Sequence, residues 1–293
     1  MTNKQNNVFK INTITPLVNF YKTYQVEYWQ NKLLLLKKSI TDYSSTNLPS
    51  QDKKSQINDE NFVRMLKAEI HFTYFQIIET LFEMMFGLEK KDDPNLWYYL
   101  TFSDWRKNYD RVDKIAEGEI SWLNSETETI NKIKMPLVQY IFYFLYDTGL
   151  NESEKKDNLD VINSAVILFA KDFSDRDDYN AYKHSLRFFQ SPVSIYVAPE
   201  GSQKYEVIGR TPDAFIYLKK DQNNLISEVT KSFDAERDFN ISMLCNNLIY
   251  NIIVARRRYF FKTDELLYNY NKVNLQSLNF TGSSLVKISF SIL

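Results

Sequence analysis

The stretch NFVRMLKAEIHFTYFQIIETLFEMMFGL, residues 61–88, decides the fold. Its apolar side chains recur at helical spacing and form two adjoining stripes. The stripes consist of Phe62, Leu66, Ile70, Tyr74, Ile77, Leu81 and Met84, and of Val63, His71, Phe75, Ile78, Phe82 and Met85. An apolar arc this wide predicts a helix at the centre of a bundle. We interpret His71, inside the arc, as a core histidine bonded to a carbonyl or an acid of another helix.

Helices are predicted on both sides of this stretch. Residues 14–42 form one long predicted helix, and residues 43–60, YSSTNLPSQDKKSQINDE, are expected to be a flexible loop because they are nearly free of apolar side chains. Shorter helices are predicted at residues 96–102, at 105–115 with Ser103 as N-cap, and at 137–146 after Pro136. A longer helix is predicted at residues 151–173.

The period of the apolar pattern changes after Gln190. Residues 193–197, 205–208, 214–218 and 225–229 alternate like strands and predict a β-meander. Residues 233–261 return to a long helix with Asp234 as N-cap, and residues 285–290 alternate as a last strand. We therefore predict a predominantly helical α+β protein. A helical bundle is expected over residues 1–190, and the meander with its long closing helix, packed on the bundle, over residues 191–293.

Composition narrows the class of protein. The 293 residues carry 36 basic and 37 acidic side chains, and this balance excludes a wholly basic nucleic-acid coat but not a local basic patch. The single cysteine excludes an intramolecular disulfide and a multi-cysteine zinc site. The first residues lack the apolar core of a secretory signal, and the longest apolar run, residues 137–146, is too short to cross a bilayer. We expect a cytoplasmic protein with no membrane partner.

The densest polar chemistry lies in residues 175–187, DRDDYNAYKHSLR. The sequence elsewhere has no HExxH, CxxC, Walker or GxGxxG pattern. On a helix, one face of this stretch would carry Arg176, Asn180, Lys183, His184 and Arg187. The opposite face would carry Tyr179, Tyr182, Leu186 and Phe189. The first face is cationic and can titrate, so it is either a candidate site or a solvated face.

The segment YNAYKH, residues 179–184, resembles the motif of the HEPN superfamily, helical bundles that include RNA-cleaving toxins and antiphage proteins. The family motif is an arginine followed, after four to six residues, by a histidine, often with a polar residue next to the arginine. Asn180 and His184 match the polar residue and the histidine, but Tyr179 stands at the arginine position. Arg176 is the nearest upstream arginine, at about 80° from His184 on a helix. The resemblance covers roughly residues 61–189.

This resemblance implies metal-independent RNA cleavage without a cofactor. His184 would help to deprotonate the ribose 2′-hydroxyl, and Arg176, Lys183 or Arg187 would stabilise the phosphorane charge. Such sites are commonly completed across a homodimer. The implied function is that of an RNA-directed protein, or a ribonuclease, of a bacterial defence or toxin system. Because Tyr179 replaces the arginine, a non-cleaving RNA-binding or scaffolding protein remains an alternative.

A second candidate site lies in the meander. Asp213 after GRTP, and Glu228 and Lys231 in ISEVTK, look similar to the PD-(D/E)xK nucleases, whose acidic residues hold Mg²⁺. That family needs glutamate and lysine two positions apart on one face of a strand. Glu228 and Lys231 are three apart and would face opposite ways unless a bulge intervenes. In this alternative, Asp213 and Glu228 would bind Mg²⁺. A third alternative is a non-enzymatic binding or regulatory subunit.

The triplet RRR at residues 256–258 is the clearest basic cluster. Its last member, Arg258, shares a polar stripe of the predicted helix with Asn251 and Asn247, which suits contact with phosphate or RNA. The other interpretation is a helix end whose cations compensate the helix dipole.

Overall fold

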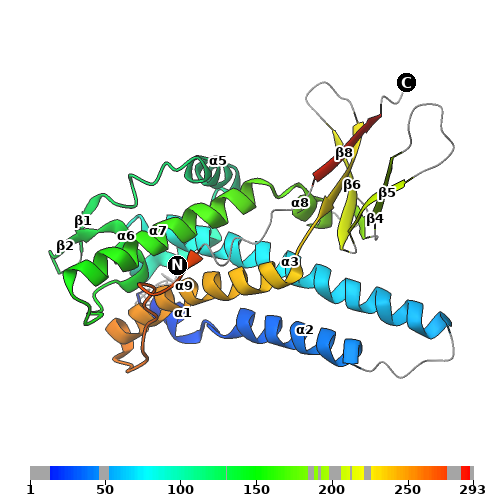
Figure 1. The fold of residues 1–293 in the computed structure, drawn as a ribbon. Helices are drawn as coiled ribbons and strands as arrows, with labels where there is room; N and C mark the ends of the chain where they lie inside the picture. Colours follow the sequence, from blue (N-terminus) through cyan, green and yellow to red (C-terminus); the bar gives the residue numbers. More distant parts are fainter. Residues whose placement is uncertain are drawn as a thin grey trace, which may run out of the picture. The chain divides into compact units, whose positions relative to one another are not determined.

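The computed structural model describes residues 14–45, 53–129, 131–183, 188–190, 193–197, 206–211, 213–220, 226–275 and 285–290. The predominantly helical α+β fold is confirmed (Figure 1). Within these ranges, no helix combines the length and the apolar character that crossing a membrane requires.

The helices occupy most of the described chain. They are α1 Ile14–Thr23, α2 Tyr28–Ser45, α3 Lys53–Leu88, the 3-10 helix η1 Asp93–Asn95, α4 Leu96–Thr101, α5 Trp105–Ala116, α6 Leu137–Tyr143, α7 Glu152–Ser174, α8 Asp177–Lys183 and α9 Ala235–Phe261. The central helix predicted at residues 61–88 is therefore confirmed and is longer than expected. The cap of α5 is Asp104 rather than Ser103, because the Asp104 side chain accepts from the backbone N–H of Lys107.

Two predicted boundaries in the first 60 residues are wrong. The helix expected at residues 14–42 is two helices, since the chain turns between α1 and α2 and buries the β-branched Val26 there. The loop expected at residues 43–60 is helical at both ends: α2 continues to Ser45 and α3 begins at Lys53. Lysine, glutamine and glutamate sustain a helix without apolar neighbours, and the sequence KKSQINDE holds neither glycine nor proline. The rest of the expected loop lies outside the described residues.

The chain forms two compact units, each assembled from three separate segments. Unit 1 comprises Met1–Val26, Thr80–Asn163 and Asn247–Lys272, and unit 2 comprises Glu27–Glu79, Ser164–Asn246 and Val273–Leu293. The boundary expected between residues 190 and 191 falls inside the Ser164–Asn246 segment of unit 2. The helices α3, α7 and α9 each contribute residues to both units.

The core of unit 1 surrounds one buried arginine. Arg256 of α9 is fully buried, and its Nε lies 2.6 Å from Oδ1 of Asp93 in η1. Its remaining N–H groups donate to the backbone carbonyls of Tyr140, Ile141 and Ile252. A short hairpin of β1 Glu126–Glu128 and β2 Lys134–Pro136 precedes α6 in this unit.

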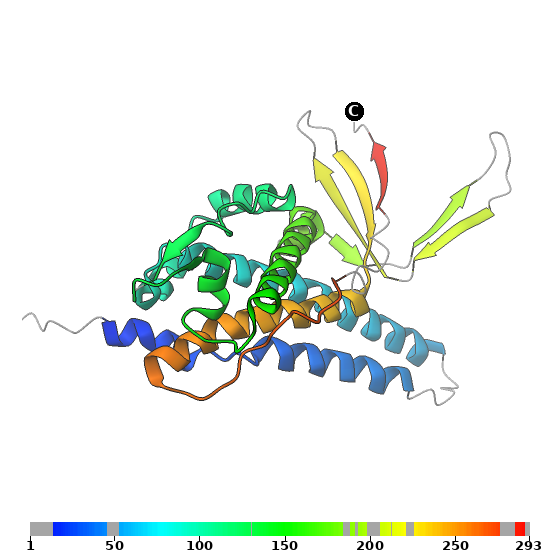
Figure 2. The ribbon, with the colours of Figure 1, turned by 60° about the vertical axis from the view of Figure 1, so that its left-hand side comes forward.

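Unit 2 contains the remaining strands: β3 Phe188–Gln190, β4 Val193–Val197, β5 Glu206–Thr211, β6 Ala214–Lys220, β7 Ile226–Ser232 and β8 Leu285–Phe290. The antiparallel sheet has the order β3-β6-β7-β8, and β4 and β5 form a separate hairpin (Figure 2). Strands are present in the stretches expected at residues 193–229 and at 285–290. The expected meander is divided, because among the described strands β4 and β5 pair with each other and not with β6. Phe189, expected on the face of a helix, lies in β3, because α8 is only seven residues long.

Candidate functional site in unit 2

A buried histidine joins three helices of unit 2. His71 of α3 lies with its Nδ1 2.6 Å from Oδ2 of Asp238 in α9 and its Nε2 2.8 Å from Oδ2 of Asp178 in α8. All three side chains are buried. The prediction of a core histidine bonded to an acid from another helix is confirmed.

The two carboxylates hold the His71 ring in its charged form. A carboxylate only accepts, so both ring nitrogens act as donors. Burial alone would lower the pKa of His71, but Asp238 and Asp178 together raise it to about 9. For Asp178, burial acts to raise the pKa, yet the hydrogen bond and charge of His71 and the charge of Lys231 lower it to about 2. The ring is therefore protonated near pH 7.

Lys231 of β7 extends this network from the sheet. Its Nζ lies 3.1 Å from Oδ1 of Asp178 and 3.1 Å from Oδ2 of Asp175. Burial would lower the pKa of Lys231, but the charges of Asp178 and Asp175 raise it. The network ties α3, α8 and α9 to the sheet. Because His71 and Asp178 are buried, we assign them a structural role.

The polar face expected on α8 is only partly present in the described chain. Lys183 is exposed and pairs with Glu79 of α3 at 2.8 Å. Asn180 and Arg176 are half-buried, and the Arg176 guanidinium donates to the Phe173 carbonyl. His184 and Arg187, also expected on this face, lie outside the described residues.

Tyr179, which stands at the arginine position of the expected motif, is part of the core. Its ring stacks on Phe75 of α3 with 5.3 Å between the centroids, and its hydroxyl donates to Glu79 at 2.9 Å. Tyr182 stacks on Phe72 with 3.8 Å between the centroids. The tyrosines of α8 therefore fix this helix to α3, as the apolar side of the predicted helix requires.

The glutamate and the lysine of the magnesium alternative do not share one face of β7. Burial alternates along β7, and Lys231 is buried whereas Glu228 points to the other side of the strand. The pairing of β7 with β6 and β8 is regular, so no bulge brings Glu228 and Lys231 together. Asp213 pairs instead with Lys67 of α3 at 2.7 Å. Within the described ranges, no three His, Cys, Asp or Glu side chains gather as metal ligands would.

The polar stripe expected on α9 belongs to unit 1 and is largely engaged there. The Asn251 side chain is fully buried and exchanges two 2.8 Å hydrogen bonds with the backbone of Tyr268, which leaves it no contact for RNA. Arg258 donates to the Glu265 carbonyl, and Asn247 is half-buried. Within the basic triplet, Arg258 lies in the last turn of α9, where a cation offsets the helix dipole, whereas Arg256 is buried against Asp93.

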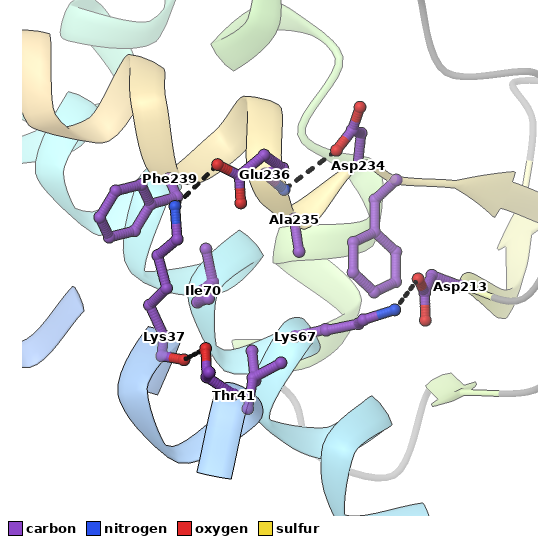
Figure 3. A pocket seen from close by; sticks show the side chains of 11 residues that line it. Lys37, Thr41, Lys67, Ile70, Asp213, Asp234, Ala235, Glu236 and Phe239 are labelled. Atoms are coloured by element: carbon purple, nitrogen blue, oxygen red, sulfur yellow. Dashed lines mark hydrogen bonds and ion pairs between the residues drawn. The ribbon is translucent and has the colours of Figure 1, made fainter. Parts of the chain in front are cut away.

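Unit 2 also contains a cavity of about 420 Å³ (Figure 3). It lies between α2, α3, the start of β6 and the start of α9. Its lining consists of Lys37, Ile40, Thr41, Lys67, Ile70, Asp213, Phe233, Asp234, Ala235, Glu236 and Phe239. The apolar bed is formed by Ile70, Phe233 and Phe239, each less than a tenth exposed.

Two ion pairs lie at opposite ends of this cavity (Figure 3). Lys37 of α2 pairs with Glu236 of α9 at 2.7 Å, and both side chains are exposed, by 40% and 64%. Lys67 of α3 lies along the floor and pairs with Asp213, and these side chains are only 31% and 14% exposed. The pair at Lys37 is therefore the one that opens at little cost.

The lining includes residues that sequence analysis did not single out. Asp234 was expected as the N-cap of α9, and its Oδ1 does accept from the backbone N–H groups of Glu236 and Arg237. No local sequence pattern indicated that Lys37, Lys67 and Glu236 would line a binding site. Lys37 and Glu236 lie 199 positions apart, so only tertiary structure reveals their pairing.

Comparisons of this chain with protein-family models, with curated proteins and with solved structures give no match.

Proposed function

We propose that the protein acts by binding a small molecule in the unit 2 cavity. The observation that carries this proposal is the cavity itself: about 420 Å³, an apolar bed and paired charges at both ends. Small-molecule sites are typically about 300–1,000 Å³ and combine apolar walls with a few polar groups. Three helices and the residues that flank β6 and α9 contribute the lining, so an occupant would also bias the packing of those elements.

The proposal is tested by a substitution that places a bulky side chain at the rim of the cavity. Thr41 is exposed and lines the cavity, so Thr41→Trp adds a ring there without disturbing the core. Lys38→Trp, which places the same ring on an exposed, non-lining position of α2, is the matched control. A panel of small cations, anions and neutral compounds is screened by thermal unfolding. We expect at least one compound to raise the Tm of the wild type and of Lys38→Trp, but not of Thr41→Trp. Hits that Thr41→Trp does not affect, or an absence of hits, would contradict the proposal.

A second candidate is the RNA-directed function that the HEPN-like segment implies, with cleavage as its enzymatic form. The observation in its favour is that α8 carries Asn180 and the exposed Lys183 one turn apart, directly before His184 in the chain. A homodimer would bring a second set of these groups to the RNA.

Cleavage of a structured RNA with and without EDTA tests this candidate. Under the ribonuclease hypothesis, cleavage persists in EDTA and is lost in His184→Ala. Loss in EDTA and in Asp213→Asn would favour the magnesium alternative instead. RNA binding that depends on Lys183, with no cleavage of the RNA, would indicate a non-cleaving RNA-binding protein.

A further inference from the structure

We infer that the unit 2 cavity binds an organic cation, namely an amine or guanidinium on a short apolar stem, and that Lys37 occupies the cation position when no ligand is bound. This inference rests on the proposed function and adds the chemical class of the ligand. Four observations on the lining lead to it.

The first observation is the balance of charge. The lining holds three carboxylates, on Asp213, Asp234 and Glu236, against two ammonium groups, on Lys37 and Lys67. The lining therefore carries one net negative charge with the Lys37 ammonium in place and two without it, so a ligand cation is favoured over an anion.

The second observation is the surroundings of the Lys37 ammonium. It lies 2.7 Å from Oε1 of Glu236 and 4.2 Å from the centroid of the Phe239 ring. A carboxylate beside an aromatic face is the environment in which proteins bind alkylammonium and guanidinium groups. The Lys37 side chain thus shows where a ligand cation would be stabilised.

The third observation is how readily this position becomes available. Lys37 and Glu236 are both exposed, and exposed ion pairs contribute little to stability because water and salt screen them. The lysine stem is flexible and can turn its ammonium into solvent. Displacing it would weaken ligand binding by at most about fivefold.

The fourth observation is the apolar bed beside the cation position. Ile70 lies between the two ion pairs, together with the small side chain of Ala235 (Figure 3), and the buried Phe233 is also part of the lining. They offer an apolar surface to a stem of a few carbons. The more buried pair of Lys67 with Asp213 closes the far end. This arrangement fits a single cation with an apolar stem better than a dication.

The probes are 1-aminopentane and butylguanidine as single cations, pentanoate as the anion and pentan-1-ol as the neutral analogue, measured by calorimetry on the full chain. We expect the cations to bind more tightly than pentanoate or pentan-1-ol. Lys37→Met keeps the stem and removes the competing ammonium, so it should tighten binding of 1-aminopentane by about fivefold. Glu236→Gln should weaken it several-fold, and Lys38→Met, on the neighbouring exposed position, should leave it unchanged.

Tightening in Lys37→Met is the outcome that a merely structural lysine would not produce. Weaker or unchanged binding of 1-aminopentane in Lys37→Met would overturn the inference, as would tighter binding of pentanoate than of the amine. If pentanoate binds more tightly than the amine and Thr41→Trp abolishes this binding, the proposed small-molecule function is supported and the cationic class of ligand is contradicted. If no probe responds to Thr41→Trp, both fall. A capped Gly-Arg-Gly peptide serves as a further arm. Binding of butylguanidine without this peptide assigns the site to a free small molecule, and binding of both extends the cation site to a protein side chain.

Discussion

Two buried cations, His71 in unit 2 and Arg256 in unit 1, are each surrounded by acceptors. A buried charge without partners costs several kcal/mol. The folded state therefore requires these contacts to offset the cost of burying the two cations. His71 has two carboxylates, and Arg256 has one carboxylate and three carbonyls. Each arrangement predicts a measurable dependence of stability on a single side chain.

We expect stability to fall as the pH rises from about 6.5 to 9. The pKa of His71 is about 9 in the folded protein against 6.5 for a free histidine, so the folded state binds the proton more tightly. Its contribution is complete below pH 6.5 and is lost as the pH passes the folded pKa. The pKa difference corresponds to about 3 kcal/mol. Urea unfolding at a series of pH values measures it.

The matched variants are His71→Gln and His184→Gln, which remove the two histidines of the chain one at a time. His71→Gln should be less stable at pH 6 and should lose most of the decline between pH 6.5 and 9. His184→Gln should keep that decline. An equally steep decline in His71→Gln would show that another group causes it.

Arg256 predicts a second large effect. Arg256→Met leaves Asp93 buried without its cation, and we expect a loss of about 3–5 kcal/mol in the free energy of unfolding. The double variant Arg256→Met with Asp93→Asn removes the uncompensated charge and should recover part of that loss. Denaturant unfolding of both variants is the measurement. A cost below about 1 kcal/mol for the single variant would contradict the buried pair.

At the scale of elements, the end of α9 stores backbone strain. Lys262 follows the last helical residue with φ 58°, a left-handed conformation that favours glycine, and its N–H donates to the Arg258 carbonyl. The side chain is exposed and approaches the Tyr259 ring at 5.2 Å. Little packing would therefore be lost on its removal.

Lys262→Gly should stabilise the protein by about 0.5–1 kcal/mol, since glycine adopts positive φ without penalty. Lys262→Ala is the matched control, because it removes the same side chain and keeps the strain. The difference between the two variants in thermal or urea unfolding isolates the backbone effect. Equal stabilities would show that the left-handed conformation at this position costs nothing.

Elements with a strong local signal could be predicted from the sequence. The two apolar stripes of residues 61–88 and the alternating strands specify their own conformation. The break between α1 and α2 could not be predicted, because the apolar spacing runs on through it and only the burial of Val26 reveals the turn. The helical start of α3 at Lys53 was missed for the opposite reason: a polar helix has no apolar period to find.

The candidate site was less predictable than the elements. His71 could be recognised as a core residue from its stripe, but its partners Asp178 and Asp238 lie 107 and 167 positions away. Asp178 follows Asp175 and Asp177 at the start of the stretch 175–187, and no local pattern distinguishes it from these neighbours. The same holds for the cavity, whose lining comes from four separate places in the chain. Local patterns specify elements, whereas a site depends on which elements meet.

For the whole molecule, the two interleaved units predict how the chain responds to division. A fragment of residues 1–190 lacks Asn247–Lys272 of unit 1 and most of the second half of unit 2. Asp93 would lose Arg256, and His71 would lose Asp238. We expect the fragment to show no cooperative unfolding transition, measured by near-ultraviolet circular dichroism.

Co-expression of residues 1–190 and 191–293 as two chains is the control. Both units are then complete in composition, and we expect the pair to associate and to regain a cooperative transition. A cooperative transition in the 1–190 fragment alone would instead restore the division into an N-terminal bundle and a C-terminal domain.

The interleaving also bears on how such a gene can recombine. Unit 1 draws on residues as far apart as 1 and 272, and unit 2 on residues from 27 to 293. A crossover with an unrelated gene anywhere between residues 27 and 272 would therefore leave both units with a foreign part. Neither unit corresponds to an uninterrupted piece of reading frame that could be exchanged as a module. We expect viable chimaeras only between close homologues, whose parts still fit across every junction.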